Sequence, residues 1–223
     1  MPFGREGICL GGPSTKFDHE PPSEETMKTI NARRHSIRDG QNDQITPEGI
    51  ALAVAEGKKD KETNVVAFGP AYRTLMTIVA FLSGLARQVR ILPPVFGLGD
   101  NDLFNVVATP EFRAAVKAGN SFFNAALMVH GREKVRVWAQ QSLEGLKSIF
   151  AQLEDGDVCT AVFHTPSIEW AAWLILEQNM GIEDMPNHLK SLNEMDGLVF
   201  LQLDNGTIVV CTSSGSKIIA ERS

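Results

Sequence analysis

Short apolar runs alternate along this chain with longer segments in which apolar positions recur every three or four residues. The short runs predict buried β-strands, and the longer segments predict helices with one apolar side. Strands are expected at residues 27–32, 64–68, 89–92, 158–163, 198–203 and 207–211, and helices at residues 46–56, 69–86 and 165–177. Residues 101–153 are expected to be mostly helical, with breaks at Pro110 and Gly119.

The alternation of strands and helices predicts an α/β protein with helices on both faces of one sheet. Asp204, Asn205 and Gly206 lie between the last two strands and are typical of a hairpin turn. Residues 1–26 are rich in Gly, Pro, Ser and acidic side chains, so a flexible arm is expected there, followed by one domain over residues 27–223.

Composition narrows the class of protein. The 21 Lys plus Arg and 27 Asp plus Glu give a net charge of −6, which argues against a nucleic-acid-binding surface over the whole protein. The longest apolar run, around residues 75–86, is too short to span a bilayer, so no membrane partner is expected. Three scattered cysteines and a polar N-terminus favour a reducing, cytoplasmic setting.

At three places a predicted strand ends and the chain leads into a helix, and each of these places, here called an exit, carries ionisable groups. The active sites of α/β folds lie at the carboxyl ends of strands, where such exits occur. The first exit holds Arg34, His35 and Arg38, the second holds Arg73, and the third holds His164. Guanidinium groups bind phosphate oxygens with paired hydrogen bonds, and a neutral imidazole can attack phosphorus. Each signal alone is weak: a basic run after a strand is more often a solvated turn, and a single histidine is more often a buried hydrogen-bonding group.

Together these segments resemble the histidine phosphatase superfamily, also called phosphoglycerate mutase-like. Its Arg-His-Gly motif corresponds to residues 34–36, and its Leu-Thr-Pro-x-Gly motif to residues 45–49. Its Ser-Pro-x-x-Arg-Thr-x-x-Thr motif corresponds to residues 69–77, and its late strand ending in histidine to His164. The four motifs occur in the family's order, which is more specific than any one of them.

The resemblance implies a three-layer α/β/α fold with a central mixed, mostly parallel sheet and a helical cap insertion at about residues 93–154. It implies that His35 is the phosphorylated nucleophile and that Arg34, Arg73 and His164 hold the phosphate. Arg38 matches a further phosphate-binding arginine of the acid-phosphatase branch. Neither a cofactor nor a metal is implied.

Two departures from the family pattern bear on activity. Ser36 replaces the family glycine, where a side chain either fits or narrows the pocket. Thr165 stands where some members carry an acidic residue directly after the second histidine. The general acid is then expected in the insertion, which holds Asp100, Asp102 and Glu111, and Asp100 or Asp102 is preferred because a polar, glycine-rich stretch surrounds them.

The resulting prediction is a metal-independent phosphatase that hydrolyses a phosphomonoester or phosphoramidate through a phosphohistidine on His35. A phosphoglycerate mutase-type phosphotransferase is one alternative. A catalytically impaired phosphate-binding or scaffold protein is another. The expected partner is a small phosphorylated substrate or a phosphoprotein, and a homodimer is left open.

Overall fold

The computed structural model describes residues 27–40, 42–99, 105–181 and 192–212. The segment predicted as a flexible arm, residues 1–26, lies outside the described residues, as do Asp100 and Asp102. In the part that is described, no helix is both long enough and apolar enough to cross a membrane.

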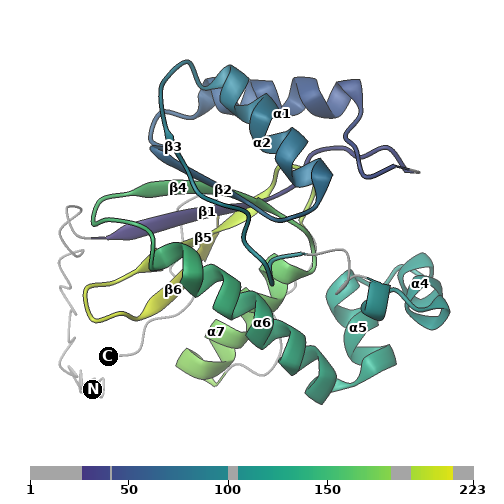
Figure 1. The fold of residues 1–223 in the computed structure, drawn as a ribbon. Helices are drawn as coiled ribbons and strands as arrows, with labels where there is room; N and C mark the ends of the chain where they lie inside the picture. The colour runs from purple at the N-terminus through teal and green to yellow at the C-terminus, as the bar shows by residue number, and fades with distance from the viewer. Residues whose placement is uncertain (1–26, 41, 100–104, 182–191, 213–223) are drawn as a thin grey trace, which may run out of the picture.

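A six-stranded sheet forms the centre of the molecule, in the order β3-β2-β4-β1-β5-β6 (Figure 1). The strands are β1 (Lys28–Arg34), β2 (Val65–Phe68), β3 (Arg90–Ile91), β4 (Val158–Phe163), β5 (Gly197–Gln202) and β6 (Ile208–Thr212). The β1–β4, β4–β2 and β2–β3 pairs are parallel, whereas β5 runs antiparallel to both β1 and β6. The carboxyl ends of the parallel strands β1, β2 and β4 therefore lie on the same side of the sheet, and the loops that follow these strands meet there.

Helices cover both faces of the sheet (Figure 1). They are α1 (Pro47–Lys59), α2 (Tyr72–Gly84), α4 (Pro110–Lys117), α5 (Phe122–His130), α6 (Arg132–Phe150) and α7 (Ser167–Met180). α1 and α2 pack together on one face, and α6 and α7 pack together on the other. The short helices α4 and α5 lie beside the far end of α6 (Figure 1). This arrangement confirms the predicted α/β fold with a mixed, mostly parallel sheet.

The larger hydrophobic core lies between the sheet and the α6–α7 layer. Ile30 and Ala32 of β1 are buried in the same cluster as Trp170 and Trp173 of α7. The ring of Trp170 stacks on Trp138 of α6, with 5.5 Å between ring centroids. Aromatic side chains bury large areas and dominate such cores. Both tryptophans of α7 therefore serve packing, and α7 begins at Ser167, three residues after His164.

Several element boundaries differ from the sequence expectation, and three of the differences have a clear cause. β1 continues to Arg34, because its ladder with β4 extends to Phe163. α2 begins at Tyr72 rather than at residues 69–70, because Gly69 still bonds to Val162 of the sheet. A further break separates α5 from α6 at Gly131, whose φ of 77° lies in the left-handed region that glycine adopts without strain.

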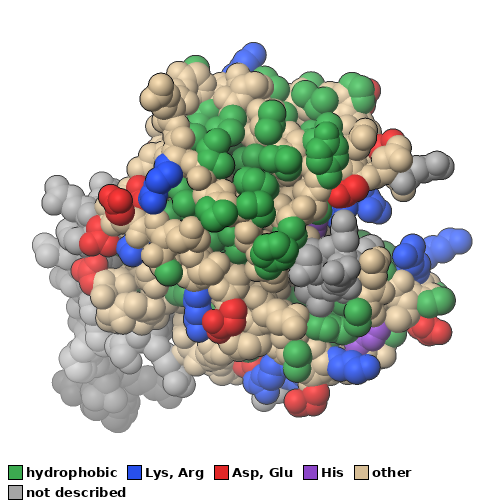
Figure 2. All heavy atoms as spheres, in the orientation of Figure 1, with side chains coloured by type: hydrophobic (Ala, Val, Ile, Leu, Met, Phe, Trp, Pro, Cys, Tyr) green, Lys and Arg blue, Asp and Glu red, His purple; other side chains and the backbone are tan. Residues whose placement is uncertain are grey.

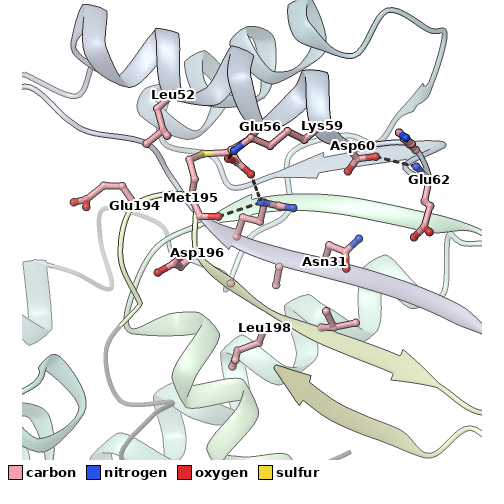
Figure 3. Close-up of a pocket in the computed structure, with 15 residues that line it drawn as sticks. Asn31, Leu52, Glu56, Lys59, Asp60, Glu62, Glu194, Met195, Asp196 and Leu198 are labelled. Carbon is pink, nitrogen blue, oxygen red and sulfur yellow. Dashed lines mark hydrogen bonds and ion pairs between the residues drawn. The ribbon is translucent and has the colours of Figure 1, made fainter. Parts of the chain in front are cut away.

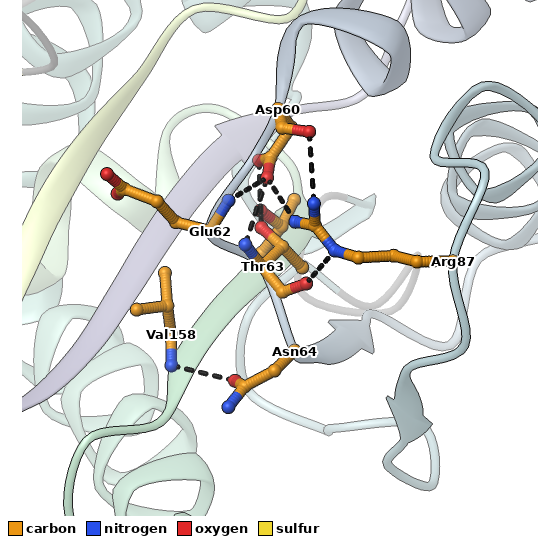
Figure 4. Close-up of polar contacts among 7 residues, drawn as sticks. Asp60, Glu62, Thr63, Asn64, Arg87 and Val158 are labelled. Atoms are coloured by element: carbon orange, nitrogen blue, oxygen red, sulfur yellow. Dashed lines mark hydrogen bonds and ion pairs between the residues drawn. The ribbon is translucent and has the colours of Figure 1, made fainter.

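A polar network holds the end of the sheet that lies away from the strand exits (Figure 4). The Asp60 carboxylate accepts hydrogen bonds from the backbone N–H groups of Glu62 and Thr63 and pairs with Arg87. The Thr63 and Thr160 hydroxyl oxygens are 2.6 Å apart. These contacts tie the loop after α1 to the loop after α2, and so fix the register of the two helices over the sheet.

Candidate active site

His35 directly follows β1, and its backbone continues the sheet. Its N–H donates to the Phe163 carbonyl at 2.9 Å, so the residue is held where β1 and β4 end. The ring atom Nδ1 lies 2.7 Å from the Ser36 carbonyl oxygen. A carbonyl oxygen only accepts, so Nδ1 carries the proton of the neutral ring and Nε2 keeps a lone pair. The ring is therefore in the tautomer that a nucleophilic Nε2 requires.

His164 follows β4 at the same edge of the sheet and faces His35. The two ring centroids are 4.9 Å apart, with an angle of 72° between the ring planes. His164 is buried, and neither of its ring nitrogens has a hydrogen-bond partner among the described residues. Buried polar atoms without a partner are uncommon and mark a place where a ligand or water is expected. The unpartnered His164 nitrogens are thus the plainest sign of a binding site.

Gly99 forms a wall of this site. A Cβ atom added to Gly99 would come within 2.4 Å of the His164 ring, and the φ of Gly99 is +105°. Both the contact and the backbone conformation require glycine at this position. The chain therefore reaches the His164 ring one residue before Asp100.

Arg73 enters the site from the first turn of α2. Its side chain is buried, and its guanidinium pairs with the Asp43 carboxylate. The other Asp43 oxygen accepts a hydrogen bond from the Tyr72 N–H at 2.8 Å, which ties this carboxylate to the N-terminus of α2. Desolvation lowers the pKa of Arg73, and the charge of Asp43 opposes that shift. Asp43 consequently orients Arg73 at the start of α2.

Arg34 is the last residue of β1, and its side chain contacts the segment that precedes β5. Its Nη1 donates to the Leu192 carbonyl at 2.8 Å, and its Nη2 lies 3.2 Å from the Glu194 carboxylate. Its buried Nε has no hydrogen-bond partner among the described residues. Arg38 is exposed, and its backbone bridges to Ile45 in the turn before α1.

The site is electrically positive. Burial lowers the pKa of His35 from 6.5 to about 4, and the charges of Arg73, Arg34 and Arg38 add to that effect. Burial also lowers the pKa of His164, and the same three arginines and His35 add to it. Both imidazoles are consequently neutral at pH 7, while the guanidiniums stay charged. A dianionic ligand would complement this arrangement.

Ser36 fits without narrowing the site. Its hydroxyl donates to the Gly49 carbonyl at 2.7 Å, and its N–H donates to the Thr77 hydroxyl at 3.2 Å. Gly49 also lets the next residue, Ile37, pass close to α1, because a Cβ on Gly49 would lie 2.5 Å from the Ile37 carbonyl oxygen. The Ser36 side chain is thus used to join β1 to α1.

Two acidic residues near the site were missed by the sequence analysis. Asp43 has no local signal, because its role depends on the fold bringing it to Arg73. Glu169 is fully buried in the first turn of α7, and burial raises its pKa to about 8. It therefore carries a proton at pH 7. Its isolation in an otherwise uncharged segment, between His164 and Glu177, was a signal that could have been used.

The predicted site residues fall into three groups. His35, His164, Arg73, Arg34 and Arg38 are brought together by the fold. Asp100 and Asp102 lie outside the described residues, and Glu111 is an exposed residue at the start of α4. Over the described ranges, no group of three or more His, Cys, Asp or Glu side chains is placed to hold a metal ion.

A separate cavity of about 680 Å³ opens on the other face of β1, between α1 and β5 (Figure 3). Arg33 crosses it, donating to Glu56 at 3.3 Å and to the Met195 carbonyl at 3.2 Å. Its lining carries more acidic than basic side chains and includes no histidine. Because the predicted nucleophile is a neutral imidazole, the chemistry is expected at the histidine pair rather than in this cavity.

Comparison with known proteins was made on sequence and on structure. No protein-family model matches the sequence, and no curated protein does either. The structure is similar to a histidine-to-alanine variant of phosphoserine phosphatase from Entamoeba histolytica in complex with phosphoserine, with a TM-score of 0.56 and 17% identity. That match covers 84% of this chain and 98% of the other.

Two bacterial structures are similar to a comparable degree. Bacillus stearothermophilus YhfR has a TM-score of 0.55 and 21% identity, and the match covers 86% of this chain and 99% of YhfR. Phosphoglycerate mutase from Bacillus anthracis has a TM-score of 0.54 and 12% identity, and the match covers 85% of this chain and 94% of the mutase. At these identities the likeness establishes the fold alone, and the fold these structures share agrees with the α/β fold that the motif resemblance implied.

Proposed function

We propose that this protein is a phosphatase that cleaves a phosphomonoester or phosphoramidate through a phosphohistidine on His35. One observation carries the proposal: two buried, neutral imidazoles meet edge to face among arginines, and the His164 nitrogens have no partner in the described part of the chain. A phosphoryl group would supply that partner. The similar phosphoserine phosphatase, whose structure is a complex with phosphoserine, supports a small phosphorylated substrate.

The first step is an in-line transfer to His35. The Nε2 lone pair forms a bond to phosphorus while the bond from phosphorus to the leaving oxygen or nitrogen breaks. Arg73, Arg34 and His164 bind the equatorial oxygens, where charge is spread in the transition state. Arg38 stands at the exposed rim and adds its charge. The leaving group takes a proton from a general acid.

Asp100 or Asp102 is the proposed general acid. Gly99 packs on the His164 ring, so the chain reaches the site directly before Asp100. In the second step, water attacks the phosphohistidine, and its proton returns to the acid as phosphate leaves. Glu111 is not proposed, because it is exposed at the start of α4, where the Thr109 side chain and the charge of His130 lower its pKa.

The experiment is turnover of para-nitrophenyl phosphate from pH 4 to 8 in the presence of EDTA. Wild type is expected to release phosphate, and His35→Ala to lose at least about 1,000-fold in rate, because the nucleophile is gone. His130→Gln is the matched control, since His130 bonds to the Val107 carbonyl away from the site. Acid-labile phosphate on wild type, absent from His35→Ala, would identify the intermediate.

Other outcomes would select another function. Equal, near-zero turnover in wild type and His35→Ala, with phosphate still bound, would indicate a binding or scaffold protein. Transfer of the phosphoryl group to a second hydroxyl without phosphate release would indicate a mutase. A requirement for added divalent metal would contradict the histidine mechanism.

A further inference from the structure

The guanidinium of Arg34 is paired with a carboxylate that solvent can reach. Its Nη2 atom lies 3.2 Å from the carboxylate of Glu194, in the segment before β5. The Glu194 side chain is 37% exposed and that of Arg34 is 23% exposed, whereas His35 and His164 are both buried. A phosphorylated molecule that binds at the histidine pair therefore meets a negative charge beside one of the arginines expected to hold its phosphoryl group.

The backbone around Glu194 fixes this carboxylate at Arg34. Before it in the sequence, the Leu192 carbonyl accepts a hydrogen bond from Arg34 Nη1 at 2.8 Å. After it, the Met195 N–H donates to the Arg34 carbonyl at 3.2 Å, and the Arg34 N–H donates to the Asp196 carbonyl at 2.8 Å. Figure 3 shows the Glu194 side chain directed away from the cavity drawn there. Glu194 consequently belongs to the histidine site rather than to that cavity.

The charges at the site are nearly balanced before a ligand binds. The charges of Arg34, Arg38 and Arg73 lower the pKa of both imidazoles, so all three guanidiniums lie near the histidine pair. Arg34 is paired with Glu194, and Arg73 with Asp43, whose side chain is 32% exposed. Among these described groups the positive charges exceed the negative charges by one, so a phosphoryl group with two negative charges already reverses the balance.

Charges farther away do not supply a counterbalance. The whole chain carries a net charge of −6. Figure 2 shows acidic side chains next to basic ones on one face of the molecule, and such neighbours largely cancel each other at a distance. Selection by charge therefore depends on the groups close to the phosphoryl group, and Glu194 is one of them.

The group to which the phosphoryl group is bonded, here called the carrier, is selected by this balance. A carrier with a negative charge would be repelled by Glu194, because like charges at short distance oppose binding. An uncharged carrier avoids that repulsion. A positively charged carrier would be attracted to the same carboxylate.

Arg38 is the alternative partner for a negatively charged carrier. It is exposed, and its backbone bridges to Ile45 before α1. Its charge acts on both imidazoles, however, so it lies close enough to serve the phosphoryl group. If Arg38 bound the carrier instead, the enzyme would prefer an anionic carrier, and the experiment below would reveal that preference.

We infer that Glu194 is a specificity-determining residue, which selects phosphorylated substrates with an uncharged or cationic carrier and disfavours those with an anionic carrier. The inference rests on the proposed function, because it concerns the substrate of the same site.

The test compares three phosphomonoesters with two-carbon carriers that differ in their end group. They are phosphoethanolamine, which ends in an ammonium, ethyl phosphate, which is uncharged there, and 2-phosphoglycolate, which ends in a carboxylate. At about pH 8 the phosphoryl group is doubly charged in all three. Wild type is expected to show the highest kcat/KM for phosphoethanolamine, and a kcat/KM for 2-phosphoglycolate about 10-fold below that for ethyl phosphate.

Glu194→Gln isolates the charge, because a glutamine oxygen can still accept from Arg34 Nη2. The readout is the ratio of kcat/KM for 2-phosphoglycolate to that for ethyl phosphate, since a general loss of activity cancels in a ratio. The ratio is expected to rise about 10-fold in Glu194→Gln. The advantage of phosphoethanolamine over ethyl phosphate is expected to disappear.

Glu56→Gln is the matched control, because Glu56 forms the equivalent pair with Arg33, at 3.3 Å. It is expected to leave both ratios unchanged. The inference would be overturned by equal kcat/KM values for the three compounds in wild type, or by a preference for 2-phosphoglycolate. A preference that persists in Glu194→Gln, or that changes equally in Glu56→Gln, would also overturn it.

Failure of the proposed function would be recognised separately. In that case wild type would release phosphate neither from the three compounds nor from para-nitrophenyl phosphate. The dissociation constants of the three compounds, measured by calorimetry on wild type and Glu194→Gln, would then decide the inference. The order expected for binding is the same as for kcat/KM, and any other order would overturn it.

Discussion

Arg33 and Arg34 are neighbours in β1, but their side chains leave the sheet on opposite faces, as successive residues of a strand do. Both are held by carbonyl oxygens and carboxylates of the chain before β5: Arg34 by Leu192 and Glu194, and Arg33 by Met195 together with Glu56 of α1. Their surroundings differ. Arg34 faces the side of the histidine pair, whereas Arg33 lies in the 680 Å³ cavity among carboxylates.

The comparison teaches that a sizeable cavity and a functional site need not coincide. Arg33 pairs with Glu56 in a cavity whose lining carries more acidic than basic side chains and no histidine. The histidine site differs because it holds two buried imidazoles whose pKa values are lowered, and the ring nitrogens of His164 have no hydrogen-bond partner among the described residues. Three experiments would break or sharpen this contrast.

The largest effect is expected from Arg73→Ala. It removes a buried guanidinium from the phosphate pocket and leaves the Asp43 charge behind, so about 4 kcal/mol of transition-state stabilisation, roughly 1,000-fold in kcat/KM, should be lost. Steady-state kinetics with para-nitrophenyl phosphate measures this. Arg87→Ala is the control, since Arg87 belongs to the Asp60 network of Figure 4. Activity within a few fold of wild type in Arg73→Ala would place Arg73 outside the pocket.

The pH dependence of stability should separate the two regions. An unfolded chain protonates His35 near pH 6.5, but the folded chain does so only near 4. The unfolded state therefore binds more protons between these values, and stability falls by roughly 3 kcal/mol as pH drops from 6.5 to 4. His164, whose pKa is also lowered, adds to the fall.

Asp60, in the lining of the Arg33 cavity, responds in a different range. Burial opposes its ionisation, but its hydrogen bonds from Thr63 and Glu62 prevail and lower its pKa below 3.8. Its contribution is thus present above pH 3.8 and lost only as pH falls further. Urea unfolding at intervals between pH 7 and 4 should show a slope that His35→Gln flattens. An identical slope in both proteins would contradict the burial of a neutral His35.

The smallest effects, and the most direct comparison, come from the two neighbouring arginines. Arg34→Ala should lower kcat/KM about 100-fold, less than Arg73→Ala because Leu192 and Glu194 already engage Arg34. Arg33→Ala should leave kcat/KM within a few fold and lower the free energy of unfolding by about 1 kcal/mol, the worth of a partly exposed ion pair. Kinetics and urea unfolding on both variants measure the two quantities. The reverse pattern would mean that the two faces had been assigned the wrong way round.

Local sequence patterns determined the order of strands and helices and the three exits that carry His35, Arg73 and His164. This was possible because apolar periodicity reports burial over a few residues, and because parallel strands in one sheet bring their carboxyl ends together. Thr46 before Pro47 also placed the start of α1 correctly, since its hydroxyl accepts the Gly49 N–H.

Only the tertiary structure decided which other residues contact the side chains at these strand ends. Arg34 meets Leu192 across 158 positions of sequence, Arg73 meets Asp43, and Gly99 closes on His164. The tertiary structure also buries Glu169 beside the site and places the Arg33 side chain in the separate cavity. Such contacts join residues that are distant along the chain, so no local pattern encodes them. They depend on which elements pack side by side, and therefore on the free energy of the whole fold.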